Sequence, residues 1–200
     1  LPPAEVAPAK QPLPEPAETG LKNYQLFRSA LVPRVRNQVQ KYDDQFAAVF
    51  AGGLPEKQAF LNLTDSEKAQ IDKTLNDLGG VVGLIHHPDE TDEMRLERYS
   101  LVNFDLAKKI IQENSDIFNS SEAQKDPRAW LIANPNEWLW LIISGYTPIQ
   151  DKRFGLLSGF PVEAVKRHPQ YQTGQVKIAN ALKSDSAKSP ELLALLGRAS

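Results

Sequence analysis

Two adjacent histidines are the first residues whose type suggests chemistry. His86 and His87 are followed by Pro88 and by a run of acidic residues that begins at Asp89. Imidazole and carboxylate groups together can bind Zn²⁺, Mn²⁺ or Fe²⁺. However, neighbouring side chains diverge by about 100° on a helix and point to opposite faces of a strand. A metal site at His86, His87 and Asp89 is therefore the alternative hypothesis, and helix capping with solvated charge is the simpler one.

No pattern in the chain indicates a catalytic nucleophile. Cysteine is absent, which excludes thiolate catalysis, disulfides and Cys-ligated metals. Ser158 lies in a Gly-Leu-Leu-Ser-Gly segment, which departs from the G-x-S-x-G of a nucleophile elbow. Gly79-Gly80 and Gly83 lack the lysine of a phosphate-binding loop. We expect no cofactor, and the sequence favours a protein that is not an enzyme.

Basic and aromatic residues are interleaved between positions 146 and 171, with Phe160 and Tyr171 among them. The candidate partner-binding residues are Tyr146, Lys152, Arg153, Phe154, Lys166 and Arg167. Cations beside stacking aromatics would suit single-stranded nucleic acid. The isoelectric point near 6.0 argues against that partner, and no helix-turn-helix, RRM or KH signature is present. Another protein is therefore the expected partner.

Charge is sorted along the chain although the net charge is only −2. Residues 43–97 carry 12 acids and 4 bases, whereas residues 150–200 carry 4 acids and 8 bases. Such an asymmetry can steer a charged partner or pair two copies of a chain, and solvated helix faces explain the same counts more simply.

Most segments around these residues have apolar side chains at the spacing of a helix. Apolar residues recur every three or four positions, which predicts one helix from Leu21 to about Leu31 and a second from Pro33 to Ala51. The same spacing from Leu96 to Ile110 predicts a longer helix, whose first turn carries Asp89, Glu90, Asp92 and Glu93. Residues 81–85 form the only plausible strand.

Capping residues mark the ends of further short helices. Thr64 and Glu67 have the spacing of a capping box, and Gly79-Gly80 should end the helix that follows. Four more helices are predicted where a capping side chain precedes a proline, because proline is favoured at the first helical position. These pairs are Asp126-Pro127, Asn134-Pro135, Thr147-Pro148 and Ser189-Pro190, and Glu137 and Gln150 could complete two capping boxes.

The combined pattern predicts an all-α fold, an irregular bundle of about seven to nine mostly short helices. Residues 138–143 are apolar on every side and should lie at the centre of its core. Residues 1–20 are rich in proline and are interpreted as an extended linker or arm. Residues 21–200 are interpreted as a single α-helical domain.

These observations favour a non-enzymatic, protein-binding helical domain on a proline-rich tether. The alternative is a small metal-binding protein or metalloenzyme that uses His86, His87 and nearby carboxylates. No apolar run approaches the roughly 20 residues that a membrane-spanning helix needs. The cysteine-free composition and the non-methionine start favour an exported protein, although a trimmed chain would look the same.

Overall fold

The computed structural model describes residues 15–87, 97–138 and 148–167. The chain divides into two compact units, Leu1–Lys109 (unit 1) and Ile110–Ser200 (unit 2). The boundary falls within helix α5 (Phe104–Glu113).

The described residues form a mixed α/β structure, so the predicted all-α bundle of seven to nine short helices is wrong. Eight α-helices accompany a three-stranded antiparallel sheet in unit 1. The strands are β1 (Glu56–Leu61), β2 (Val82–His87) and β3 (Glu97–Asn103), in the order β1-β3-β2. The strand predicted at residues 81–85 corresponds to β2, and neither β1 nor β3 was predicted.

The central strand β3 replaces the first half of the helix predicted from Leu96 to Ile110. Leu101 lies opposite Lys57 of β1 and Leu84 of β2, and every residue from Arg98 to Asn103 is buried. A strand buried on both faces shows no polar–apolar alternation, so its sequence can imitate part of a helical pattern. Helix α5 begins directly after β3, where the Asn103 Oδ1 accepts the Leu106 backbone N–H at 3.0 Å.

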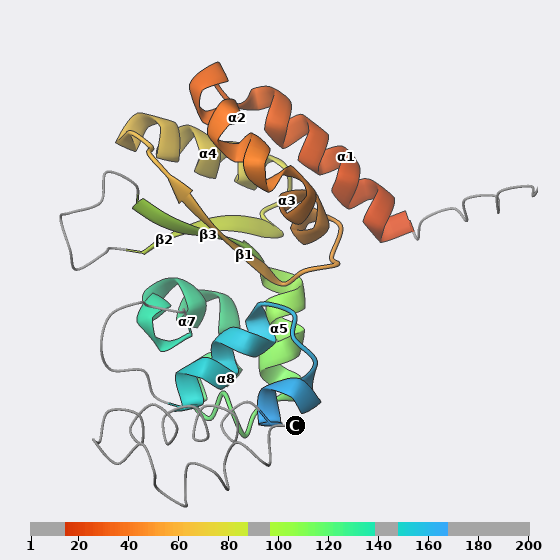
Figure 1. Cartoon of the computed structure of the whole chain (residues 1–200), viewed down its shortest axis with the longest axis vertical. Helices are drawn as coiled ribbons and strands as arrows, with labels where there is room; N and C mark the ends of the chain where they lie inside the picture. Colours follow the sequence, from red (N-terminus) through yellow and green to blue (C-terminus); the bar gives the residue numbers. More distant parts are fainter. Residues whose placement is uncertain (1–14, 88–96, 139–147, 168–200) are drawn as a thin grey trace, which may run out of the picture. The chain divides into compact units, whose positions relative to one another are not determined.

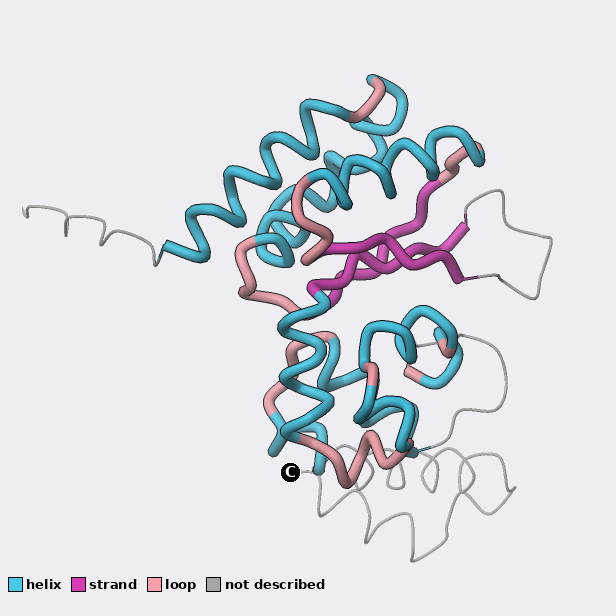
Figure 2. Tube along the Cα trace, turned by 180° about the vertical axis from the view of Figure 1, so that it is seen from behind, coloured by secondary structure: helices cyan, strands magenta, loops and turns pink. Residues whose placement is uncertain are grey.

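Four helices cover one face of the sheet (Figure 1), and the view from behind shows the same layer (Figure 2). They are α1 (Glu15–Ala30), α2 (Pro33–Val39), α3 (Asp43–Phe50) and α4 (Asp65–Asp77), with the short 3₁₀ helix η1 (Gln40–Tyr42) between α2 and α3. The sheet contributes Ala59, Leu61, Val82, Leu84, Tyr99 and Leu101 to the core beneath them. The helix predicted from Pro33 to Ala51 is thus broken at η1, and the helix predicted from Leu21 begins earlier, at Glu15.

Local signals in α4 behave as expected from the sequence. The Glu67 backbone N–H donates to Thr64 Oγ1 at 3.2 Å, and the Thr64 N–H donates to Glu67 Oε2 at 2.8 Å. The capping box is therefore confirmed. Gly79 and Gly80 follow the helix with φ angles of 99° and 65°, which is the left-handed conformation that ends a helix.

Close packing of α1 against the end of α3 depends on a glycine. A Cβ atom placed on Gly20 would lie 2.1 Å from the carbonyl oxygen of Phe50. No side chain fits there unless the backbone of α1 or α3 moves.

Unit 2 contains short helices whose starts were partly predicted. They are α6 (Ser121–Lys125), α7 (Pro127–Ala133), the 3₁₀ helix η2 (Pro135–Glu137) and α8 (Pro148–Leu157), and residues 162–167 are also helical. The Asp126 side chain accepts the Ala129 N–H at 3.0 Å, as its cap position predicts. Asn134 makes no side-chain capping bond, so the capping box with Glu137 does not form. Thr147 and Ser189-Pro190 lie outside the described residues.

Trp138 is fully buried in unit 2, and its indole Nε1–H donates to the Leu131 carbonyl oxygen at 3.0 Å. This agrees with a core position for the first residue of the apolar run, and residues 139–143 lie outside the described residues. Residues 1–14 also lie outside them, and α1 begins within the region predicted as the arm, residues 1–20.

Candidate functional site

His86 and His87 lie on β2 with their side chains on opposite faces of the sheet. The His86 side chain is exposed, and its Nε2 lies 3.2 Å from the Glu97 carboxylate. The His87 side chain is fully buried. Asp89 lies outside the described residues, and the part of the chain that the structure describes holds no group of three His, Asp or Glu side chains that could bind a metal. The structure therefore does not bring the two histidines together around one ion.

Burial controls the protonation of His87. Burial, followed by the neighbouring charges of Arg98 and His86, lowers the pKa of this imidazole from 6.5 to about 3. Arg98 is directly opposite His87 in the sheet. His87 is consequently neutral at physiological pH.

The sheet face that carries His87 also holds several other buried polar side chains. The Ser100 hydroxyl donates to Glu56 Oε1 at 2.6 Å, which joins β3 to β1. The Arg98 guanidinium lies over the Phe60 ring, 5.4 Å from its centroid. Sequence reasoning missed this cluster because it follows from the register of β1 and β3, which were not predicted. The Ser100 proton is held by a carboxylate, so this arrangement serves as a cross-strand hydrogen bond.

The residues of the candidate partner-binding set occupy different environments in unit 2. Lys166 and Arg167 are exposed on the helical segment 162–167, whereas Lys152 and Phe154 are partly buried on α8. Tyr146 lies outside the described residues. Arg153 is buried, with only 6% of its surface exposed.

Arg153 is occupied by contacts within unit 2. Its Nε–H donates to the Ile117 carbonyl oxygen at 3.1 Å, and its Nη1 donates to Glu137 Oε2 at 2.8 Å. Its guanidinium also lies over the Trp130 ring, 5.6 Å from the centroid. A side chain with this many internal partners holds the helices of unit 2 together.

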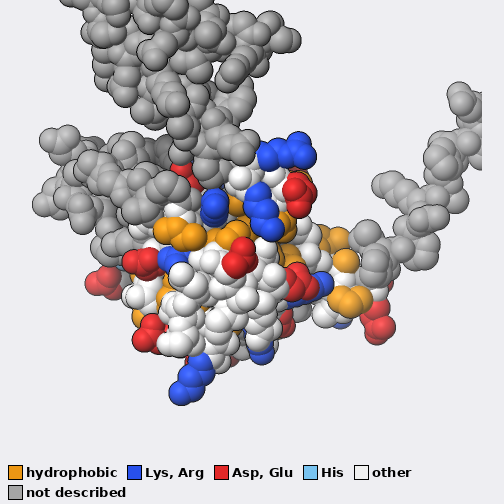
Figure 3. Space-filling model, turned by 90° about the horizontal axis from the view of Figure 1, so that it is seen from below, with side chains coloured by type: hydrophobic (Ala, Val, Ile, Leu, Met, Phe, Trp, Pro, Cys, Tyr) orange, Lys and Arg blue, Asp and Glu red, His pale blue; other side chains and the backbone are white. Residues whose placement is uncertain are grey.

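Phe160 is the most exposed large hydrophobic side chain among the described residues, at 58%. The sequence placed it among the interleaved aromatics, but nothing in the local pattern distinguished it from Phe154. Val162, close by in the chain, is 36% exposed. On the unlabelled face seen in Figure 3, hydrophobic side chains adjoin both basic and acidic ones.

The turn that presents Phe160 is held by backbone hydrogen bonds. Gly159 adopts a φ of 83°. Its N–H donates to the Leu156 carbonyl oxygen, and the Phe160 N–H donates to the Gly155 carbonyl oxygen at 3.0 Å. This is the Schellman arrangement that ends a helix with glycine. The buried Val165 then anchors the following segment, because its methyl groups pack against Gly155. The phenyl ring is therefore displayed from a fixed turn.

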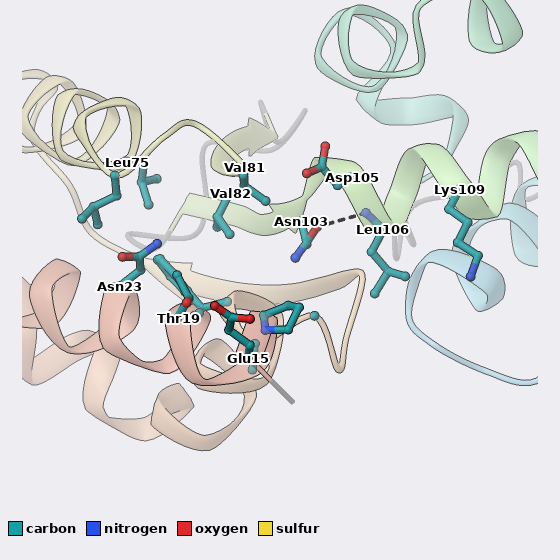
Figure 4. A pocket seen from close by; sticks show the side chains of 16 residues that line it. Glu15, Thr19, Asn23, Leu75, Val81, Val82, Asn103, Asp105, Leu106 and Lys109 are labelled. Atoms are coloured by element: carbon teal, nitrogen blue, oxygen red, sulfur yellow. Dashed lines mark hydrogen bonds between the residues drawn. The ribbon is translucent and has the colours of Figure 1, made fainter. Parts of the chain in front are cut away.

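A cavity of about 650 Å³ lies within unit 1, and no sequence pattern indicates it. It is lined by residues of α1, of β2, of α5 and of the ends of α3 and α4 (Figure 4). Its volume is in the range of small-molecule sites in proteins, about 300–1,000 Å³. The Asn103 amide in its wall is already engaged, since its Nδ2 donates to the Val49 carbonyl oxygen at 2.9 Å.

Comparison with known proteins does not add a functional assignment. The chain matches no protein-family model, no curated protein and no solved structure. Within the described ranges, no helix combines the length and apolar character needed to cross a membrane.

Proposed function

We propose that this protein is a non-enzymatic binding protein whose partner is another protein, and that Phe160 is the centre of the contact surface. The observation that carries the proposal is the 58% exposure of this ring on a hydrogen-bonded turn. Exposed aromatic residues are enriched at protein interfaces, where a few of them supply most of the binding energy. A fixed turn lowers the entropy lost when the ring is immobilised by a partner.

The surroundings of Phe160 indicate the chemistry of the partner. Lys166 and Arg167 are exposed on the next helical segment, which also carries the exposed Glu163. The segment 162–167 therefore has a net charge of +1. A complementary partner would offer an apolar pocket for the phenyl ring with acidic side chains at its rim.

The proposal is tested by co-purification from an extract of the organism that makes the protein. Phe160→Ala is compared with Ile132→Ala, which removes a side chain of similar exposure, 51%, from α7 of the same unit. We expect a protein that is retained by the native chain and by Ile132→Ala. The affinity of this partner for the Phe160→Ala variant should be at least about tenfold lower than for the native chain, as expected when a hot-spot residue is removed. Calorimetry with the purified partner measures this change.

The charged rim has its own test. Charge reversal by Lys166→Glu and Arg167→Glu should slow association and invert its dependence on ionic strength, because added salt then screens repulsion instead of attraction. Equal retention of every partner by Phe160→Ala and Ile132→Ala would contradict the proposed surface.

A further inference from the structure

The cavity in unit 1 has one polar wall. Glu15, Thr19 and Asn23 occur at intervals of four residues on α1, so they lie on one stripe of the helix, and all three line the cavity. Figure 4 shows their side chains rising from α1 towards it. Among the described residues, none forms a hydrogen bond or ion pair with these three side chains. The stripe spans about 12 Å along the helix axis.

The side of the cavity opposite α1 is largely apolar. It includes Leu75, Leu78, Val81, Val82 and Leu106, next to the polar Asn103, Asp105 and Lys109. Val81 is 41% exposed, so part of this apolar surface faces solvent. A ligand that fills the cavity would cover it and gain the corresponding hydrophobic free energy.

The position of the polar wall is fixed by packing. Gly20, which also lines the cavity, lies on α1 between the polar residues and leaves no room for a Cβ beside Phe50. The polar stripe of α1 is thus held in place against the end of α3.

Three charged residues line the cavity, and their formal charges sum to −1. Asp105 and Lys109 are four residues apart on α5, a spacing at which an acid and a following base attract each other. The cavity lining therefore holds one more acid than base. Glu15 is the charged group of the α1 wall, and it is exposed.

We propose that this cavity is a binding site for a small organic ammonium ion with an apolar body. The ammonium group donates hydrogen bonds to the Glu15 carboxylate and to the Thr19 hydroxyl one turn further along α1, while the apolar body covers the exposed Val81 side chain. This site lies in unit 1, and its ligand class differs from the protein partner proposed for Phe160, so either proposal can fail without the other.

Calorimetry on the full chain with three probes tests the ligand class. n-Octylammonium is the matched ligand, octanoate has a similar chain with the opposite charge, and n-butylammonium keeps the charge with four fewer methylenes. We expect octylammonium to bind, and each of the other two to bind at least tenfold more weakly. Octanoate binding as tightly as octylammonium, or no binding of octylammonium, would overturn the proposal.

Two variants on α1 test the position of the site. Glu15→Gln removes the carboxylate that lines the cavity, and Glu18→Gln changes the same residue type in the same first turn of α1, outside the cavity lining. We expect octylammonium affinity to fall about tenfold in Glu15→Gln and to stay within twofold in Glu18→Gln. Val81→Ser, at an exposed position, should also weaken binding. Equal effects of Glu15→Gln and Glu18→Gln would show that the ammonium binds elsewhere and overturn the assignment.

Discussion

The environment of single residues depends on the sheet as well as on their neighbours in sequence. The alternation of a strand already indicates that His86 and His87 diverge, and the structure confirms this. It does not indicate which of the two is buried, because that depends on how the face of β2 packs. The same holds for Arg153, whose charge suggested a surface contact and whose hydrogen bonds to Ile117 and Glu137 are internal.

The buried His87 makes stability depend on pH. Its pKa is 6.5 in an unfolded chain and about 3 in the folded protein. Between these values the unfolded state binds a proton that the folded state does not, so the free energy of unfolding falls as the pH drops below 6.5. One such group contributes a slope of up to about 1.4 kcal/mol per pH unit.

Urea unfolding at pH 7, 6 and 5 measures this contribution, because carboxylates titrate mostly below that range. We expect the free energy of unfolding of His87→Leu to lose this dependence on pH. The control variant His86→Leu, changed at an exposed site, should keep it. Identical pH dependence in the native chain and His87→Leu would contradict the assignment.

At the scale of secondary structure, elements defined by local signals were predictable, and those defined by pairing were not. The capping box at Thr64 and Glu67 and the cap at Asp126 depend only on neighbouring residues, and both are present. Strand β1 contains Glu56, Lys57 and Gln58, residue types with little preference for strands. Its conformation depends on pairing with β3, which is distant in sequence. The cavity was not predictable for the same reason, since it needs α1 packed beside β2 and α5.

The contact between α1 and α3 gives a prediction that opposes helix propensity. Alanine is favoured over glycine within a helix by about 1 kcal/mol, yet a Cβ on Gly20 would lie 2.1 Å from the Phe50 carbonyl oxygen. We therefore expect Gly20→Ala to destabilise the protein by about 1–3 kcal/mol, as overpacking does. Gly53→Ala is the control, because a Cβ there would meet its nearest atom at an ordinary 3.5 Å. Denaturant unfolding of both variants measures the difference, and equal stabilities would contradict the close approach.

For the whole molecule, the charge asymmetry of the sequence is partly offset within unit 1, because Arg28 and Arg34 lie outside residues 43–97 and pair with acids inside them. Several acids of residues 43–97 have a cationic partner nearby. The ion pairs are Arg28–Asp43, Arg34–Glu67, Lys68–Asp72 and Lys73–Asp77. The count of 12 acids and 4 bases therefore overstates the charge available to attract a partner. This is why the proposed partner surface depends on the exposed Phe160 ring and its adjacent cations.

The placement of the tryptophans allows the two compact units to be followed separately. All three tryptophans, Trp130, Trp138 and Trp140, belong to unit 2, whereas Gly20 and its close contacts Phe50 and Ala51 belong to unit 1. Tryptophan emission therefore reports the unfolding of unit 2, and far-UV circular dichroism reports both units. Because each unit has its own network of contacts, we expect Gly20→Ala to lower the midpoint seen by circular dichroism and to leave the tryptophan midpoint unchanged.

Coincident transitions in the native chain that shift together in Gly20→Ala would instead mean that the whole chain unfolds as one cooperative unit. A separate transition would have a consequence for the two proposed sites. Octylammonium would then raise the midpoint of unit 1 alone, because a ligand stabilises only the folded state that binds it. A protein bound at Phe160 would raise the tryptophan midpoint alone.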